Sequence, residues 1–326
     1  MNRTVPQRVS IVIPTWNRKQ LLADCLRSIA TQSRAPDEVI VVDDGSTDGT
    51  AEFVKNEFPF ACVVRLEQNR GFCVAINAGI RATSCELLLL LNNDMTLGPA
   101  FVESLVRAAS GSDAAMFAPL VLFRDEPDLI YCAGDRQLAN GRPESIGFRT
   151  PRGGFDHPGR IFGVSAGAGL YRHEVFESVG LFDERFVAYF EDSDLNLRAR
   201  LAGFQAEYVP DAVAYHVGSA SLDGKYWWRS RQCYRNHALL VLKNYPIPLM
   251  IRTCPSIARE RFHQFGRSLY SARSEFGILK AVMVVLGVWC ELVGALPHVV
   301  RSRRRIDIIR RLPSSELRAM LDDNTS

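Results

Sequence analysis

The sequence predicts an α/β fold, with a mainly parallel sheet covered by helices on both faces and a C-terminal helical extension. Three observations carry this prediction. Short apolar runs alternate with stretches of helical periodicity through the first third of the chain, each run ends in a polar cluster, and the pattern becomes helical and arginine-rich from about residue 226. We therefore expect one α/β domain over residues 1–225 and a helical extension over 226–326.

The predicted elements follow in order along the chain. Apolar runs too short for helices indicate strands, and apolar residues at helical spacing indicate the helices between them. The expected strands are 9–13, 39–42, 62–66 and 87–91, and the expected helices are 21–30, 51–56, 72–81, 98–109 and 192–201. Ser46 and Thr47 are expected to open the second of these helices. Glycines and prolines fill residues 125–160, which we interpret as a long loop, with a hairpin, lying over the active site.

Composition excludes several classes of protein. The 47% hydrophobic content of the 326 residues rules out global disorder, and a net charge of +3 gives no argument for nucleic-acid binding. The eight cysteines form no C-x-x-C pair, so we read them as reduced and mostly buried residues of a cytosolic protein. The N-terminus shows no signal-peptide pattern, and the G-x-G-x-x-G and G-x-x-x-x-G-K-[ST] fingerprints are missing.

Polar clusters follow four successive predicted strands. Each of them alone is a plausible turn, because Asp, Asn and Gly are the commonest turn residues. In a parallel sheet, however, ligands bind at the carboxyl ends of the strands, and four such clusters fall on one edge. The clusters are P-T-W-N-R (14–18), D-D-G-S-T-D-G-T (43–50), N-R-G (69–71) and N-N-D (92–94).

These motifs carry a resemblance to a known family. With the preceding strands, and with F-V-A-Y-F-E-D-S-D-L-N-L-R-A-R-L-A-G-F further on, the sequence resembles the family 2 inverting glycosyltransferases, which have the GT-A fold, a Rossmann-like variant of the architecture predicted above. The resemblance covers roughly residues 8–240 and is closest to the rhamnosyltransferase-like enzymes of surface polysaccharide assembly. It implies transfer of a sugar, rhamnose in that subgroup, from a nucleoside diphosphate donor to a saccharide or lipid-linked saccharide.

The resemblance implies a donor pocket at the strand ends. A carboxylate accepts a hydrogen bond from a pyrimidine N3–H, and the family places Asp44 in that role, whereas an Asx-turn explains Asp43 equally well. Arg70 is suited to a phosphate or a base carbonyl, with an ordinary surface arginine as the alternative. The implied donor-binding residues are Pro14, Thr15, Asn17, Asp43, Asp44, Asn69, Arg70, Gly71 and Asn93.

A diphosphate leaving group calls for positive charge, and a divalent metal supplies it. Hard oxygen ligands suit Mg²⁺ or Mn²⁺, and the resemblance makes Asp94 the metal carboxylate. Asn92 and Asn93 depart from the two-acid version of the motif, which implies weaker metal binding. A helix N-cap is the alternative for Asp94. In related enzymes a histidine at the position of His216 reaches the metal or the diphosphate, and a structural role is its alternative.

Inverting transfer is a single displacement and needs a base for the acceptor hydroxyl. The family pattern makes Asp192 that base, with Glu191 orienting it or binding the acceptor. Both residues open a predicted helix, whose N-terminus favours the charged carboxylate. We expect Asp194 to be ordinary helix N-terminal charge, and Arg198 and Arg200 to point outward.

The tail combines an apolar stretch with a run of arginines. Its uninterrupted apolar run covers only residues 281–290, and ten residues are too few to span a bilayer. The stretch 278–300 is expected either to pack as core or to face a membrane. The arginines at 301–305 favour a membrane surface, so we expect a cytoplasmic protein held peripherally at the inner face of the cell membrane. Trp227 and Trp228 suit a sugar ring, a core or a membrane face.

The sequence thus predicts a metal-dependent inverting glycosyltransferase of the hexosyltransferase type. Two alternatives stay open. A nucleotidyltransferase shares a related sheet, but it would carry a glycine-rich basic loop after the first strand, where residues 14–18 hold no glycine. A non-catalytic sugar-nucleotide-binding or scaffold protein would be favoured by loss of Asp94 or Asp192, and both are present.

Overall fold

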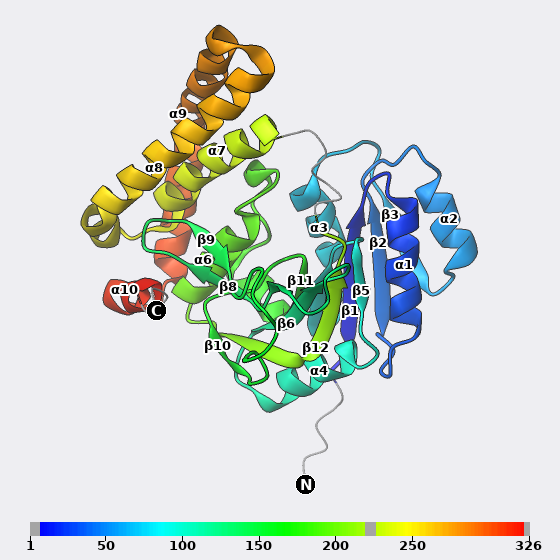
Figure 1. Ribbon diagram of the computed structural model, residues 1–326. Helices are drawn as coiled ribbons and strands as arrows, with labels where there is room; N and C mark the ends of the chain where they lie inside the picture. Colours follow the sequence, from blue (N-terminus) through cyan, green and yellow to red (C-terminus); the bar gives the residue numbers. More distant parts are fainter. Residues whose placement is uncertain (1–6, 219–225, 323–326) are drawn as a thin grey trace. The chain divides into compact units, whose positions relative to one another are not determined.

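The computed structural model describes residues 7–218 and 226–322 (Figure 1). Within these residues the chain forms two compact units. The first comprises residues 7–135, 145–184 and 204–218, and the second comprises 136–144, 185–203 and 226–322. The second unit therefore takes in the segment around the acidic pair Glu191–Asp192 as well as the C-terminal helices. The domain boundary near residue 225 stays a prediction.

A ten-stranded mixed sheet forms the centre of the first unit. Strands β3, β2, β1 and β4 lie side by side and parallel, and β11 joins β4 in the antiparallel sense before β6, β12 and β10 complete the order. The strands are β1 (Val9–Thr15), β2 (Glu38–Asp43), β3 (Ala61–Arg65), β4 (Leu87–Leu91), β5 (Met95–Leu97), β6 (Met116–Phe123), β7 (Ile130–Cys132), β10 (Gly159–Ile161), β11 (Ala168–Arg172) and β12 (Ala206–His216).

Helices cover both faces of this sheet. One face of the sheet packs against α1, α2 and α4. Alternate residues of β1, namely Val9, Ile11 and Ile13, point to this face and share a core with buried residues of those helices. The opposite face meets α3, where Gly79 lies so close to Val12 that an added Cβ would stand 2.2 Å from it. The helices of this unit are α1 (Lys19–Ala30), α2 (Thr50–Glu57), α3 (Phe72–Arg81), α4 (Phe101–Gly111) and α5 (His173–Val179).

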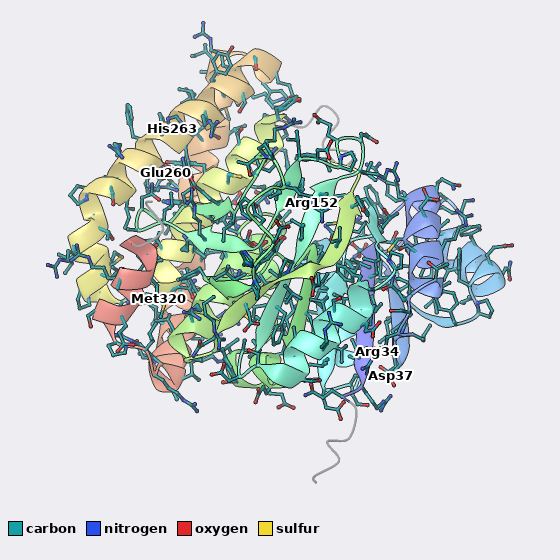
Figure 2. The ribbon with its side chains drawn as sticks, turned by 60° about the horizontal axis from the view of Figure 1, so that its bottom comes forward. Arg34, Asp37, Arg152, Glu260, His263 and Met320 are labelled. Atoms are coloured by element: carbon teal, nitrogen blue, oxygen red, sulfur yellow. The ribbon has the colours of Figure 1, made fainter. Side chains whose placement is uncertain are left out.

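Local hydrogen bonds hold the chain at the beginning of β1. The Asp37 carboxylate accepts from the backbone N–H of Val9 at 2.9 Å, and Arg34 donates to the carbonyl of Gln7 at 2.8 Å. Both labelled side chains lie beside the start of β1 (Figure 2).

The predicted start of α4 is wrong by three residues, whereas α2 begins one residue before its predicted start at 51, although Ser46 and Thr47 do not open it. Helix α2 begins at Thr50 rather than directly after Ser46 and Thr47. The Asp48 carboxylate accepts from the backbone N–H of Thr50, and Gly49, the residue that precedes the helix, has a left-handed backbone. Helix α4 begins at Phe101 rather than at residue 98.

The segment 125–160 is more ordered than the predicted loop. It contains β7, which pairs with β6, and the start of β10, which pairs with β12. The predicted hairpin is present as a separate two-stranded sheet of β8 (Asp135–Gln137) and β9 (Pro143–Ser145). Its predicted place over the active site stays a prediction.

The second unit is helical. Long helices α7, α8 and α9 pack against one another, and α6 contacts α7 and α9 (Figure 1). Met320 on α10 accepts from the Arg200 guanidinium at 3.0 Å, and Glu260 and His263 lie on α8 (Figure 2). The helices are η1 (Glu184–Phe186), α6 (Glu191–Leu201), α7 (Tyr226–Asn244), α8 (Ile247–Phe276), α9 (Ile278–Ile309) and α10 (Ser314–Asp322).

Helix α9 is partly core and partly exposed, and that its exposed side faces a membrane stays a prediction. One stripe along it is buried, and the other is exposed and equally apolar. The buried stripe is Ala281, Val285, Val288, Leu292, Ala295, Val299 and Ile306. The exposed stripe is Ile278, Leu279, Val282, Met283, Leu286, Trp289, Val293, Leu296 and Val300.

The length of α9 corrects one premise of the sequence argument. Lys280, Glu291 and Pro297 do not end the helix, which runs for 32 residues. By length and composition alone it is long and apolar enough to cross a membrane, and 28% of its most apolar window is buried inside the protein.

The cysteines are all free thiols. The prediction that most of them are buried is only half right. Cys25, Cys73, Cys85 and Cys132 are buried, whereas Cys62, Cys254 and Cys290 are exposed and Cys233 is intermediate.

Candidate active site

The carboxyl ends of β4, β1, β2 and β3 meet at one edge of the sheet. In the parallel register Thr15 lies opposite Asp43, and Asp43 lies opposite Arg65. The predicted donor-binding clusters that follow these strands are therefore neighbours. Pro14 and Thr15 lie at the end of β1, and Asn93 follows β4 closely enough for its side-chain amide to donate to the Thr15 hydroxyl at 2.8 Å.

Asn17 joins the loops after β1 and β2. Its side-chain oxygen accepts from the backbone N–H of Thr47 at 2.8 Å, and its own N–H donates to the Ser46 hydroxyl at 2.9 Å. The residue is left-handed, with φ at 49°, which Asn tolerates better than most residues. Asn17 thus shapes the rim of the site, and the neighbouring Trp16 is left 47% exposed.

The two adjacent aspartates hold the loops that follow β2 and β3. Asp43 accepts from the backbone N–H of Ser46 at 2.9 Å, which is the Asx-turn that the sequence left as an alternative. The Asp44 oxygens accept from the backbone N–H groups of Arg70 and Gly71, both at 2.8 Å. Both carboxylates are buried, and Asp44 fixes the segment Asn69–Arg70–Gly71 whose exposed arginine side chain extends from the same loop.

Asp94 and His216 lie together in the first unit. Oδ1 of Asp94 is 3.3 Å from Nε2 of His216, and both side chains are buried. The His216 ring packs 4.2 Å from the Tyr131 ring, centroid to centroid, and its Nδ1 accepts from the backbone N–H of Gly218 at 3.2 Å. Asp94 is not a helix N-cap, because α4 starts seven residues later with Ala100 as its N-cap residue.

These two side chains fit a divalent metal that is completed by other ligands. Asp94 Oδ1 makes no hydrogen bond within the described part of the chain although it is shielded from solvent, and its polar neighbour is Nε2 of His216 at 3.3 Å. A carboxylate oxygen and an imidazole nitrogen at this spacing could share a divalent cation. No group of three or more His, Cys, Asp or Glu side chains in residues 7–218 and 226–322 is arranged to hold a metal. The remaining ligands would therefore come from diphosphate oxygens and water, which is the usual pattern for Mg²⁺.

Glu191 and Asp192 belong to the second unit, where they open α6. Asp192 accepts from the backbone N–H of Ser193 at 2.7 Å. Oε2 of Glu191 is shielded from solvent and accepts no hydrogen bond from any described residue, although the residue as a whole is partly exposed. Burial, reinforced by the neighbouring Asp192 charge, raises the pKa of Glu191 well above its usual range.

Three predictions made for α6 are wrong. Asp194 is not ordinary helix charge: it is fully buried and binds Arg198, Lys243 and Asn244 at 2.8–2.9 Å. Arg198 therefore points inward rather than outward, and Arg200 reaches α10 rather than solvent. The buried carboxylate joins α6 to α7.

Asn236 on α7 is a residue that the sequence reasoning missed. It is fully buried, and its side-chain amide lies within hydrogen-bond distance of three carbonyl oxygens in the turn just before Glu191. Helix α7 also buries Gln232, His237 and Lys243, so an asparagine in it gave no distinctive signal in the sequence. Trp228 lies 6.1 Å from Tyr189 and Trp227 lies 5.0 Å from Phe276, centroid to centroid, so both tryptophans pack on aromatic rings of the same unit.

Similarity to solved structures defines the class of fold. The crystal structure of GalNAc-T7 with UDP, GalNAc and Mn²⁺ matches with a TM-score of 0.60 at 18% identity, over 74% of this chain and 48% of that one. The mannosyltransferase PcManGT from Pyrobaculum calidifontis, in complex with GDP-Man and Mn²⁺, matches with a TM-score of 0.53 at 18% identity, over 94% and 86%. The GT-A fold with a C-terminal helical region is confirmed.

The family follows from the sequence comparison. Residues 10–180 match the family described as glycosyl transferase family 2, which is more than half of the chain. The chain belongs to glycosyl transferase family 2, as its motifs predicted. Both solved structures named above contain Mn²⁺, which supports a divalent metal in enzymes of this fold.

Two relatives indicate the kind of biology in which the family works. The poly-beta-1,6-N-acetyl-D-glucosamine synthase of Staphylococcus epidermidis is 25% identical over 252 residues, covering 73% of this chain and 57% of the synthase. The N-acetylglucosaminyl-diphospho-decaprenol L-rhamnosyltransferase of Mycobacterium tuberculosis is 27% identical over 231 residues, covering 63% and 75%. The chain thus spans little more than half the length of the synthase, and the rhamnosyltransferase supports the predicted subgroup.

Proposed function

We propose that this protein is a metal-dependent, inverting glycosyltransferase that moves a hexosyl group, rhamnose being the first candidate, from a nucleoside diphosphate to a lipid-linked saccharide. The observation that carries the proposal is the buried Asp94 oxygen, which accepts no hydrogen bond from any described residue and lies 3.3 Å from Nε2 of His216. It lies beside His216 in the unit whose strand-end loops form a donor-binding edge. The Mycobacterium tuberculosis relative is an N-acetylglucosaminyl-diphospho-decaprenol L-rhamnosyltransferase, so its acceptor is lipid-linked.

The first unit would bind the donor. Asp44 would accept from the base, as the loop that it holds presents Arg70 toward a phosphate or a base carbonyl. Thr15 and Asn93, already joined by a hydrogen bond, would face the ribose and diphosphate. Asp94 and His216 would hold the metal, which when bound neutralises charge on the departing diphosphate. Nε2 of His216, which lies 3.3 Å from Asp94 Oδ1, would be the nitrogen that faces the metal.

Asp192 would act as the base. A carboxylate in the first turn of α6 has its charged form favoured by the helix N-terminus, and it takes the proton of the acceptor hydroxyl as that oxygen attacks the anomeric carbon. The bond from that carbon to the diphosphate oxygen breaks in the same displacement. Glu191, whose raised pKa keeps it protonated at neutral pH, would donate a hydrogen bond to the acceptor rather than compete as a base.

Donor hydrolysis tests the proposal directly. The purified chain is screened against nucleoside diphosphate sugars with Mg²⁺ or Mn²⁺, and release of the nucleoside diphosphate is measured. We expect turnover that chelation abolishes for at least one donor. Tight donor binding without turnover, in the presence of metal and a saccharide acceptor, would instead support a sugar-nucleotide-binding protein. Release of pyrophosphate from a nucleoside triphosphate would support a nucleotidyltransferase.

The exposed stripe of α9 is proposed to rest on an anionic membrane surface. Exposed Arg301, Arg304 and Arg305 continue the helix beyond the stripe and suit lipid phosphates. Arg303 does not belong to this group, because its guanidinium donates to the carbonyls of Leu242 and Tyr245 at 2.7 and 3.0 Å and so caps α7. This arrangement would keep the protein cytoplasmic and would bring it to lipid-linked acceptors at the inner face of the membrane.

A further inference from the structure

The turn that precedes the acidic pair is conformationally strained. Val187, Tyr189 and Phe190 have φ angles of 63°, 67° and 70°, in the left-handed region that non-glycine residues rarely adopt. For a β-branched residue such as valine this backbone is a clear outlier. Strain of this kind persists only where the surroundings hold it, and Glu191 and Asp192 follow directly.

One buried side chain holds this turn. The Asn236 amide nitrogen lies 2.8 Å from the Phe186 carbonyl oxygen, 2.9 Å from that of Ala188 and 2.8 Å from that of Tyr189. Asn236 is fully buried, so water does not substitute for these bonds.

The orientation of this amide is fixed from its other side. The Asn236 oxygen accepts from the Arg235 guanidinium at 2.7 Å, and the same nitrogen of Arg235 donates to the carbonyl of Arg185 at 2.8 Å. Arg235 is itself held by Glu291 of α9 at 2.9 Å. A guanidinium has no acceptor, so the amide must present its oxygen to Arg235 and its two hydrogens to the turn.

We infer that Asn236 is a positioning residue for the reaction: it holds the turn 186–190 in its left-handed form and so sets the direction in which Glu191 and Asp192 leave it. The inference rests on the proposed role of Asp192 as the base. Loss of the amide removes the donor that the Ala188 and Tyr189 carbonyls share, while the Phe186 carbonyl keeps only the Ala188 N–H at 2.7 Å, and the turn relaxes toward ordinary backbone angles. The acid pair then moves with it, and a shift of about 1 Å at a catalytic group can cost about 10²-fold in rate.

Asn236→Ala and Asn77→Ala form a matched pair. Asn77 in the first unit is equally buried and also binds backbone, with both groups of its amide on Phe182 at 2.9 and 3.0 Å. We expect both variants to melt at lower temperature. Only N236A should lose kcat, by about 10²-fold, with donor KM unchanged within about threefold. Equal small losses of kcat in both variants would overturn the inference, since a merely structural asparagine behaves that way.

A second substitution tests the strain itself. Val187 is 40% exposed, so replacing it by glycine removes little packing and makes the left-handed angle accessible at little cost. In the N236A background, V187G should therefore restore kcat by about threefold to tenfold. A double variant no more active than N236A would overturn the positioning role.

The amide hydrogen-exchange rates of residues 186–190 measure the stability of the turn directly and do not depend on an enzymatic assay. Exchange there should rise by at least about tenfold in N236A and stay unchanged in N77A. Unchanged exchange in N236A overturns the inference, whereas raised exchange in a protein without transferase activity upholds the clamp and refutes the proposed function. If N236A does not fold, Arg235→Gln, which removes the donor that orients the amide, takes its place, with about a tenfold loss of kcat expected and the same outcomes deciding.

Discussion

Replacing Glu191 by glutamine should stabilise the protein at neutral pH and much less at acidic pH. Burial raises the pKa of this carboxyl from 4.5 to about 8, so between these pH values the folded protein keeps a proton that the unfolded chain has lost. Stability therefore falls as pH rises through this window. Glutamine mimics the protonated form and removes the penalty.

The size of the effect follows from the pKa elevation. Each pH unit above the unfolded pKa of 4.5 costs the wild type about 1.4 kcal/mol of unfolding free energy. From there to pH 7 is about 2.5 units, so E191Q can gain at most about 3.4 kcal/mol over the wild type at pH 7. Sharing of the shift with Asp192 and relaxation of the turn reduce this, so we expect about 1–3 kcal/mol.

Urea melts of the wild type and E191Q, at several values from about pH 5 to about pH 8, measure the difference. The gap in unfolding free energy should be smallest at the acidic end, at most about 0.8 kcal/mol near pH 5, and should widen steadily with pH. Glu57, an exposed glutamate of α2, supplies the control, and E57Q should shift the curve by the same small amount at every pH. A gap between wild type and E191Q that does not change with pH would refute the reasoning.

Three further outcomes test the site and the tail. Asp94→Ala and His216→Ala should each raise the metal concentration for half-maximal donor hydrolysis and leave binding of the free nucleoside unchanged; a lower melting temperature with unaltered metal dependence would make His216 structural. Asp192→Asn should cut turnover by about 10²–10⁴-fold with donor binding within about twofold, and near-normal transfer would move the base elsewhere. Leu286→Glu should weaken binding to phosphatidylserine vesicles at every salt concentration, whereas Arg304→Gln should weaken it only at low salt, because salt screens charge but not apolar burial. Unaltered vesicle binding in both variants would leave the stripe without a membrane role.

Local signals in the sequence were enough for the first four strands and their helices, but β5, β6, β7, β10, β11 and β12 of the same sheet were not predicted. Five consecutive leucines between turn residues predicted β4 with its observed bounds, and α3 has the predicted start and end at Phe72 and Arg81. The placement of the polar clusters on one edge followed from parallel connectivity, which is a general rule rather than a detail of packing. The family resemblance added the pairing of Asp94 with His216, which are far apart in the sequence and 3.3 Å apart in the structure.

Features that depend on distant partners were not predictable. Nothing near Arg198 in the sequence shows that Asp194 is drawn inward by Lys243, which lies on another helix. In the same way, Asn236 binds carbonyl groups 47 to 50 residues away, and no local pattern marks such a contact. The apolar tail was ambiguous because one side of α9 packs inside the protein while apolar residues on its other side are exposed. Composition alone does not distinguish the buried side of such a helix from the exposed side.

The two aspartates that flank Ser193 are alike in sequence, but the structure gives them opposite energetic roles, and one substitution separates them. Asp194→Asn removes the carboxylate that compensates two buried cations, those of Arg198 and Lys243, whose side chains are 6% and 4% exposed. Breaking a buried ion pair by removing one partner costs about 3–5 kcal/mol, so D194N should melt at much lower temperature. Asp192 is partly exposed, and asparagine keeps its size and an acceptor oxygen for the Ser193 N–H, so D192N should unfold within about 0.5 kcal/mol of the wild type in a urea titration while losing turnover. Were D194N as stable as D192N, the buried group at the start of α6 would not be the anchor of this helix, and the acid pair would depend for its orientation on the turn before it alone.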